Sequence, residues 1–209
     1  MIPGKNCILR LSRYRNILAR FKSLGFVKVF SDHLADAVGC TASQVRKDFS
    51  LFGIAGRRRG GYNIDLLLEK LSGILGKDSI QNVILVGAGN LGSALLKYKG
   101  FGKEDIRITA AFDADPSKQG KMLGIPVFPL QNLAAYVREN GIEIAILAVP
   151  AEVAQESSEV LTAAGIRGIL NFAPVTLRVG PGVVVNDIDM AIELENVIYY
   201  VHALERKGQ

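Results

Sequence analysis

Residues 83–92 read Val-Ile-Leu-Val-Gly-Ala-Gly-Asn-Leu-Gly and decide the fold of the C-terminal part of the chain. Four apolar residues run directly into a G-x-G-x-x-G pattern, and Asp113 follows about 20 residues later, as a dinucleotide site requires. In such a site the first glycine permits a tight turn, the second lets the backbone approach a pyrophosphate, and the third lets the helix pack closely on its strand. The stretch predicts a buried parallel strand over 81–86, a helix that starts near Asn90, and a dinucleotide pocket between them.

An acidic residue stands at the end of the next apolar run, which predicts a second strand over 106–112. A carboxylate at Asp113 can accept hydrogen bonds from both ribose hydroxyls and repels a 2′-phosphate, so NAD(H) is favoured over NADP(H). Asp115 adds to this repulsion. The expected cofactor contacts from this loop and strand end are Gly87, Ala88, Gly89, Asn90, Leu91, Gly92 and Asp113.

Two more apolar runs, over 142–149 and 166–170, predict further strands of the same parallel sheet. Open α/β sheets bind ligands beyond the carboxyl ends of their strands. The residues that follow these two strands are therefore expected to face the nicotinamide end of the cofactor. They are Val149, Pro150, Asn171, Phe172 and Pro174. A turn-forming role is equally compatible with the position of Asn171.

The first 50 residues carry helical patterns. Apolar residues recur at helical spacing over 8–24, and a short second helix is predicted over 32–38 with Ser31 as its cap. A third helix begins after Thr41, and Gln44 three residues later completes a capping box. Two short helices joined by a tight glycine turn predict a helix-turn-helix.

The third helix is expected to turn Gln44, Arg46, Lys47 and Asp48 outward and Val45 and Phe49 inward. An arginine fork fits guanine edges, glutamine suits adenine, and lysine reaches guanine or phosphate. An ordinary solvated helix face is the alternative. Residues 51–56 lead into Arg-Arg-Arg-Gly-Gly-Tyr over 57–62, which predicts the cationic tip of a wing hairpin suited to a narrow minor groove. The expected DNA contacts are Thr41, Ser43, Gln44, Arg46, Lys47, Arg57, Arg58, Arg59 and Tyr62.

Charge is divided unequally along the 209 residues. Residues 1–78 hold 14 Lys and Arg against 6 Asp and Glu, a net +8, whereas residues 79–209 hold 11 against 14, a net −3. The imbalance predicts a polyanionic partner for the N-terminal part, although RNA-binding modules share this bias. No run approaches the ~20 apolar residues of a membrane span and no signal-peptide core is present, so we expect a cytoplasmic protein without membrane contact. Cys7 and Cys40 have no metal-ligand spacing; two small buried thiols in a reducing compartment are favoured over a thiol switch.

Signals for catalysis are missing. The only histidines are His33 and His202, and no Tyr-x-x-x-Lys pair occurs that could donate a proton beside a transferred hydride. The sequence thus favours cofactor sensing over an enzyme. Two alternatives remain open: an NAD-dependent oxidoreductase with a basic N-terminal interaction module, and a regulator that answers a different nucleotide such as an adenylate.

The last segment, residues 187–207, lacks glycine and proline and predicts a helix. Its apolar residues Met190, Leu194, Val197, Val201 and Leu204 are spaced 4, 3, 4 and 3 apart, as in a helix-pairing seam. The helix is expected either to close its own domain or to pack against a second subunit, which is the favoured arrangement.

The order of these parts, together with the motifs over 44–50, 61–62, 87–92, 149–151 and 168–174, closely resembles the Rex redox-sensing transcriptional repressors. The resemblance implies an α/β chain of two domains: an N-terminal winged helix-turn-helix (1–78) and a Rossmann-like parallel-sheet domain that binds NAD(H) (79–188). A C-terminal helix (189–209) is implied to swap between the subunits of a homodimer. It also implies a palindromic double-stranded DNA operator in front of fermentation and respiratory genes, from which NADH releases the protein.

Further roles come only from this resemblance. Tyr98 and Asp189 match a tyrosine and an aspartate that help to couple the nicotinamide state to the subunit arrangement. Asn16 stands where the family has an arginine partner for that aspartate, with Arg15 beside it as the possible substitute. Arg59 stands where the family wing has glycine.

Overall fold

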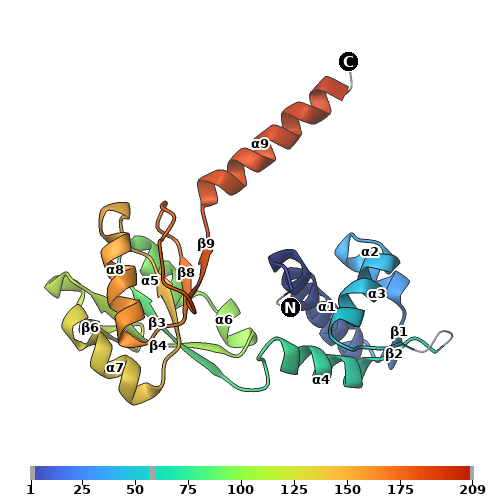
Figure 1. Cartoon of the computed structure of the whole chain (residues 1–209), viewed down its shortest axis with the longest axis horizontal. Coiled ribbons are helices and arrows are strands. Elements are labelled where there is room, and N and C mark those ends of the chain that lie inside the picture. Colours follow the sequence, from blue (N-terminus) through green and yellow to red (C-terminus); the bar gives the residue numbers. More distant parts are fainter. Residues whose placement is uncertain (1–2, 57–59, 208–209) are drawn as a thin grey trace. The chain divides into compact units, whose positions relative to one another are not determined.

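The computed structural model describes residues 3–56 and 60–207. The chain divides into two compact units, Met1–Ser79 and Ile80–Gln209, which Figure 1 colours from blue to teal and from green to red. Three residues of the predicted wing tip, Arg57, Arg58 and Arg59, lie outside the described residues. The predicted treatment of residues 189–209 as a separate dimerisation segment stays a prediction.

Within the described part of the first unit, four helices and a two-stranded antiparallel ribbon surround one apolar core. The elements are α1 (Lys5–Ser23), β1 (Lys28–Val29), α2 (Ser31–Val38), α3 (Ala42–Leu51), β2 (Tyr62–Asn63) and α4 (Ile64–Ile74). Leu11, Tyr14 and Leu18 of α1 are fully buried, one turn apart on a single face. This stripe packs against Val45 and Phe49 of α3, which confirms the predicted inward face of that helix.

The helix-turn-helix consists of α2 and α3, and Gly39 between them has φ +73°, a left-handed conformation that suits glycine. The predicted cap of α2 was wrong, because Ser31 is the first helical residue and Phe30 precedes it without a side-chain cap. At α3 the Thr41 Oγ1 accepts a hydrogen bond from the Gln44 N–H at 3.1 Å, as predicted. The reciprocal half of the capping box is not formed, since the Gln44 side chain is bonded to Asp48 instead.

The ribbon differs from the predicted wing hairpin. β2 pairs antiparallel with β1, in the register Val29 with Tyr62, and residues 54–56 form no strand. A two-residue strand between two helices has no periodicity from which to predict it. The close pairing requires Gly61, where an added Cβ would lie 2.5 Å from the Val29 carbonyl oxygen.

The second unit contains, within the described residues, a seven-stranded sheet in the order β5-β6-β4-β3-β7-β8-β9. All neighbouring strands are parallel except β5 with β6. The strands are β3 (Gln81–Val86), β4 (Ile106–Asp113), β5 (Gly120–Met122), β6 (Ile125–Pro129), β7 (Ile144–Leu147), β8 (Gly168–Asn171) and β9 (Val184–Asp187). From β6 to β9 this is the doubly wound Rossmann order, with the first strand of the domain at its centre.

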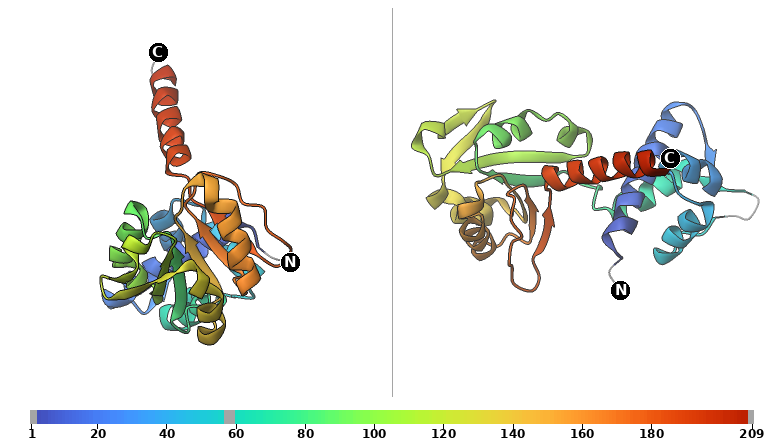
Figure 2. Two further views of the ribbon diagram at one scale, coloured as in Figure 1. Left: turned by 90° about the vertical axis from the view of Figure 1, so that its left-hand side faces the viewer. Right: turned by 90° about the horizontal axis from the view of Figure 1, so that it is seen from above.

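Helices cover both faces of this sheet (Figure 2, left view). The α-helices are α5 (Asn90–Lys97), α6 (Gly100–Lys103), α7 (Leu133–Asn140), α8 (Ala151–Ala164) and α9 (Met190–Lys207), and single 3₁₀ turns occupy Pro116–Lys118 and Leu130–Asn132. Along β3, Val83 and Leu85 join the apolar cluster beneath α5 and α6, whereas Ile84 and Val86 join the cluster beneath α7 and α8. Burial on both faces explains why this strand reads as a continuous apolar run.

The last strand, β9, was not predicted. It pairs in parallel with β8, so that the final helix begins at Met190 rather than at residue 187. The two strands predicted over 142–149 and 166–170 are present but displaced at their ends, as β7 and β8. Strand ends depend on which neighbours pair with them and are poorly specified by local sequence.

The apolar residues of α9 are exposed in the single chain. The seam residues Met190, Leu194, Val197, Val201 and Leu204 are 50–71% exposed. None of the helices in residues 3–56 and 60–207 combines the length and apolar character that a membrane span needs. An uncovered stripe of this size is typical of a helix that binds another protein surface.

Candidate dinucleotide pocket and recognition helix

A cavity of about 610 Å³ lies at the carboxyl ends of β3, β4 and β7. This volume falls within the range of small-molecule and cofactor sites. Eight of the predicted cofactor residues line the cavity: Gly87, Gly89, Asn90, Leu91, Asp113, Val149, Pro150 and Phe172. The cavity lies at the edge of the sheet where the sequence predicts the dinucleotide site.

The three glycines of the loop have different physical roles. Gly87 has φ +96°, and an added Cβ would lie 2.3 Å from the Ala148 carbonyl oxygen. A Cβ at Gly92 would lie 1.9 Å from the Gly87 carbonyl oxygen, because α5 packs directly on this turn. Gly89 differs: its φ is −70° and no protein atom lies within 4 Å of an added Cβ. The fold therefore requires glycine at positions 87 and 92, whereas the open space at Gly89 borders the cavity.

The Asp113 carboxylate is almost completely buried at the end of β4. Its Oδ2 accepts a hydrogen bond from the Ala88 N–H at 2.7 Å, and its Oδ1 accepts one from the Asp115 N–H at 2.9 Å. Lys118 Nζ lies 3.6 Å from Asp113 Oδ2 and 3.8 Å from Asp115 Oδ2. The positive charge of Lys118 therefore offsets part of the negative charge of Asp113 and Asp115 at the end of β4. Lys118 also lines the cavity.

Much of the remaining wall was not predicted. It comprises Val86, Phe112, Ala114, Lys118, Leu130, Leu133, Ala148, Val153, Glu156, Ser157 and Val160. Most of these residues are apolar, and they come from the strand ends, from the start of α7 and from the first three turns of α8. The helical spacing of the α8 residues indicates only an amphipathic helix, and nothing in the sequence distinguishes a face that contacts a ligand from one that contacts the core.

Four predicted contact residues do not line the cavity: Ala88, Gly92, Asn171 and Pro174. Asn171 is fully buried, and its Nδ2 donates hydrogen bonds to the Val175 carbonyl oxygen and to Asp187 Oδ1, both at 2.8 Å. Its Oδ1 accepts a hydrogen bond from the Ala173 N–H at 3.0 Å. Asn171 thus organises the turn after β8 and ties it to β9, in agreement with the alternative interpretation of this residue.

The exposed side chains of α3 include Ser43, Arg46 and Lys47, and the capping residue Thr41 is also exposed. Tyr62 of β2 is half-buried and its ring packs edge-on against Phe49 at 5.1 Å. The predicted exposure of Asp48 was wrong: the residue is 1% exposed. Gln44 is half-buried above it.

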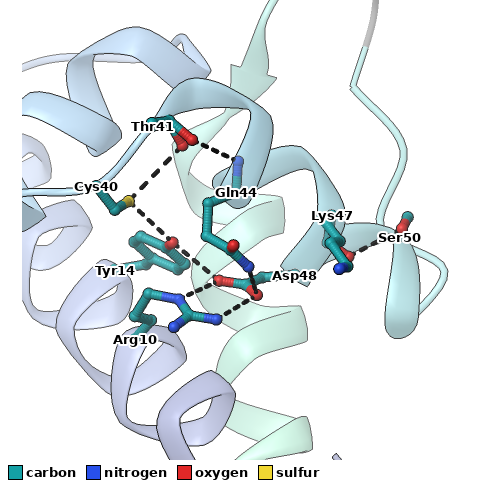
Figure 3. A network of polar contacts seen from close by, with 8 residues as sticks. All are labelled: Arg10, Tyr14, Cys40, Thr41, Gln44, Lys47, Asp48 and Ser50. Atoms are coloured by element: carbon teal, nitrogen blue, oxygen red, sulfur yellow. Dashed lines mark hydrogen bonds and ion pairs between the residues drawn. The ribbon is translucent and has the colours of Figure 1, made fainter.

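Asp48 is buried because four donor groups surround its carboxylate (Figure 3). Arg10 Nε and Nη2 donate at 2.6 and 2.7 Å, Tyr14 Oη donates at 3.0 Å, and Gln44 Nε2 donates at 2.8 Å. Burial by itself would raise the pKa of Asp48, but the hydrogen bonds from Arg10, Gln44 and Tyr14 outweigh it and hold that pKa below its ordinary value. Burial also raises the pKa of Tyr14, whose hydroxyl keeps its proton as a donor.

Both cysteines are free thiols, but the predicted burial holds only for Cys7, because Cys40 is half-buried. Cys7 is buried, which raises the pKa of its thiol and keeps it unreactive. Cys40 Sγ lies 3.5 Å from Tyr14 Oη. Within the described ranges, no group of His, Cys, Asp and Glu side chains is arranged to hold a metal ion.

The three residues with an expected coupling role each have a local contact. Tyr98 follows α5 and is exposed, and its ring lies edge-on to Phe101 at 5.1 Å. Asp189 Oδ1 accepts a hydrogen bond from the Ala191 N–H at 2.9 Å and so caps the start of α9. Arg15 Nε donates to Ser72 Oγ of α4 at 3.1 Å, while the neighbouring Asn16 is exposed. Their coupling role stays a prediction.

A helix-turn-helix with exposed cations, joined in one chain to a Rossmann sheet with a cofactor-sized cavity, defines a ligand-responsive transcription factor. The "CoA binding domain" family matches residues 78–175, and the "Putative DNA-binding protein N-terminus" family matches residues 2–50. Redox-sensing transcriptional repressors named Rex are 40–43% identical to this chain over at least 92% of its length, so the chain belongs to the Rex family.

A relative and two solved structures illustrate this membership. The redox-sensing transcriptional repressor Rex of Carboxydothermus hydrogenoformans is 43% identical over 195 residues, which cover 93% of this chain and 94% of the relative. The structure of RSP in complex with β-NAD⁺ and operator DNA is 33% identical, with a TM-score of 0.92 over 100% of this chain and 96% of that one. The structure of RSP in complex with β-NADH has a TM-score of 0.86, again at 33% identity, and covers all of both chains.

Proposed function

We propose that this protein represses transcription by binding a palindromic double-stranded DNA operator, and that NADH releases it from the operator. The observation that carries the proposal is the cavity at the glycine loop and Asp113, in the same chain as a helix-turn-helix with exposed Arg46 and Lys47. The β-NAD⁺, β-NADH and operator complexes of the similar RSP support the same ligands for this chain.

The residues of the cavity suit a dinucleotide. Asp113 is a buried carboxylate that can accept hydrogen bonds from ribose hydroxyls. Gly89 and the amino terminus of α5 provide backbone N–H groups and the positive end of a helix dipole for a pyrophosphate. Leu130, Leu133 and Val153 offer an apolar surface of the kind that an adenine ring contacts.

The wall near Val149, Pro150 and Phe172 is apolar and is the proposed nicotinamide end. A nicotinamide, when bound, supplies a ring that is a cation in the oxidised state and neutral in the reduced state. Placing a cation against these three side chains carries a desolvation penalty that the neutral ring avoids. The wall is therefore proposed to favour NADH over NAD⁺.

We further propose a homodimer built on the exposed apolar seam of α9. Two copies of α3 would then meet two half-sites about 34 Å apart, or a multiple of this spacing, and a change in dimer geometry would spoil the match. A repressor acts where the chromosomal DNA lies, so the proposed location is the cytoplasm.

An oxidoreductase is the second candidate that the fold allows, but the relatives are repressors and we propose no catalytic step. Of the two histidines, His33 lies in α2 and His202 in α9, and neither lines the cavity. Incubation with NADH and candidate carbonyl substrates checks this point, since an enzyme would consume the NADH absorbance. A regulator of a different nucleotide would keep its ligand response after Asp113→Ala.

The deciding experiment measures binding of the full chain to palindromic DNA by fluorescence anisotropy, with NADH or NAD⁺ added in turn. We expect NADH to weaken operator binding about 100-fold, which needs ~2.7 kcal/mol of coupling and lies within the usual range for allostery. NAD⁺ should have a much smaller effect. Equal effects of the two cofactor forms would refute redox sensing.

A further inference from the structure

The carboxylate of Asp48 is saturated with hydrogen bonds. Each oxygen accepts two: Oδ1 from Arg10 Nη2 and Gln44 Nε2, and Oδ2 from Arg10 Nε and Tyr14 Oη. A carboxylate has about four acceptor positions, so none is left for another donor. An acidic side chain on a helix that approaches phosphates would ordinarily repel them, but here the paired Arg10 neutralises the charge.

The donors join two helices that are distant in sequence. Arg10 and Tyr14 lie one turn apart on α1, and both point to the same carboxylate on α3 (Figure 3). The arginine makes a two-pronged contact, which fixes direction as well as distance. The turn of α3 that carries Gln44 and Asp48 is thereby held in one orientation against α1.

This arrangement also determines which way the Gln44 carboxamide points. The nitrogen and oxygen of a free carboxamide can exchange places by rotation about χ3. Ionised Asp48 only accepts hydrogen bonds, so the Gln44 nitrogen must face it and the oxygen must point away. Within residues 3–56 and 60–207 no hydrogen bond to Gln44 Oε1 is formed, and the side chain is half-buried rather than enclosed.

We propose that Asp48 is a positioning residue that determines base specificity. By orienting Gln44, it presents the Oε1 acceptor to the major groove, where adenine and cytosine carry an exocyclic amino group and guanine and thymine carry a keto oxygen. Gln44 thus discriminates amino from keto bases on the contacted strand, at one position in each half-site. The inference rests on the proposed DNA binding of α3.

The test is a selection from a randomised double-stranded DNA pool, using the full-length chain without NADH and sequencing the bound fraction. The wild type should favour adenine or cytosine over guanine and thymine at one position of each half-site. In Asp48→Asn the new amide can donate or accept, so Gln44 is free to turn and this preference should disappear. Gln44→Ala should lose the preference at the same position. The expected loss is about 2- to 10-fold in discrimination, the value of one hydrogen bond, because only Oε1 of Gln44 is left to contact the base.

Asp36→Asn is the matched control, because Asp36 is an exposed carboxylate on α2 outside the network. It should keep the wild-type preference, although it makes the same change in net charge. A second readout separates positioning from folding: Asp48→Asn removes a negative charge and should bind random DNA at least as tightly as the wild type while its specific binding weakens. Partial unfolding would lower both affinities alike.

Several results would overturn the inference. One is an amino-over-keto preference that stays unchanged in Gln44→Ala or in folded Asp48→Asn. Another is that the two variants change the base preference at different positions of the half-site. If Asp48→Asn does not fold, Gln44→Ala still shows whether Gln44 makes the contact, since its truncation leaves the Arg10–Asp48 pair in place. The amino-over-keto preference of the wild type then shows whether Gln44 is oriented, because a freely rotating carboxamide would accept both kinds of base, and its absence would overturn the inference. If the wild type enriches no sequence, the proposed DNA function itself fails, and this inference with it.

Discussion

The Asp113 carboxylate accepts a hydrogen bond from the Ala88 N–H at 2.7 Å, which ties the end of β4 to the glycine loop that follows β3. The two parts of the dinucleotide fingerprint, 25 residues apart in sequence, are therefore one structural unit. A ribose that contacts this carboxylate would also contact the residue that holds the loop in shape. Loop geometry and cofactor affinity should change together.

Asp113→Ala should weaken NADH binding by about 10- to 100-fold, because hydrogen bonds to a charged group are worth ~1.5–3 kcal/mol. Isothermal titration calorimetry measures this change. Glu143→Ala is a suitable control, since Glu143 is an exposed acid that precedes β7 and so lies at the amino end of the sheet strands. Operator binding without cofactor should survive in both variants, and equal NADH affinity in the two would contradict the role of Asp113.

Gly92→Ala should lower the stability of the fold, whereas Gly89→Ala should lower the affinity for NADH. At Gly92 the new methyl group would lie 1.9 Å from a backbone oxygen, so we expect the free energy of unfolding to fall by about 1–3 kcal/mol. At Gly89 the methyl group meets no protein atom, so thermal stability should stay near the wild-type value. NADH affinity should nevertheless fall by about tenfold or more in Gly89→Ala, ~1.4 kcal/mol. Thermal unfolding and NADH titration of both variants check the contrast, and normal NADH binding by Gly89→Ala would show that the open space is not used.

Acid should weaken the N-terminal unit through Asp48. Burial alone would raise the pKa of this carboxyl, yet hydrogen bonds from Arg10, Gln44 and Tyr14 leave it below the ordinary value of 3.8. A carboxyl with a lowered pKa in the folded state stabilises the fold above its unfolded-state pKa, and this contribution is lost as the pH falls through the folded-state value.

The free-energy difference between the wild type and Asp48→Asn should therefore be constant above about pH 5 and shrink below about pH 4. Urea unfolding followed by circular dichroism at a series of pH values measures it. Asp36→Asn again serves as the comparison, and a difference that grows on acidification would mean that the pKa is raised instead.

The seam of α9 should hold two subunits together. Val197 and Val201 are 57% and 50% exposed in the single chain, and each is worth ~1.5–3 kcal/mol when fully buried. The double change Val197→Asp with Val201→Asp should give a monomer in sedimentation velocity at concentrations where the wild type is a dimer. Glu195→Gln, off the seam, should leave the dimer intact. A dimer that persists in the double variant would place the interface elsewhere.

Two kinds of arginine should differ in their contribution to DNA binding. Arg46→Ala should cost ~1–3 kcal/mol of specific binding and relax the preference at one base pair. Arg58→Ala or Arg59→Ala should instead weaken binding to most sequences alike and lower the salt dependence by about one charge. Anisotropy titrations against operator and random DNA at several salt concentrations distinguish the two patterns. A strong sequence-dependent loss from Arg58→Ala would contradict the predicted wing role.

The sequence was most informative where the structure depends on residues that are close together along the chain. Strand β3, the glycine turn and the start of α5 follow one another within ten residues, and all were predicted correctly. The helix-turn-helix was equally local, because Gly39 and Thr41 determine its turn and its second cap. The predicted hairpin was wrong in its first strand, because β1 pairs with β2 across more than 30 residues and is too short to show a pattern.

The candidate sites show the same difference between features that are local in sequence, which could be predicted, and contacts between distant segments, which could not. Short stretches of sequence contain the glycine fingerprint, Asp113 and the cations of α3. From these stretches and from the composition, the fold class, the cofactor type and the DNA partner could be predicted. Only the tertiary structure decided that Asp48 is buried beneath Arg10, that Lys118 lies beside Asp113, and that Asn171 joins β8 to β9. The contacts of Asp48 and Asn171 each join two chain segments that are distant in sequence and that folding brings together. The burial, charge environment and hydrogen bonds of such a side chain depend on the distant segment, so the residues next to it in sequence do not predict them.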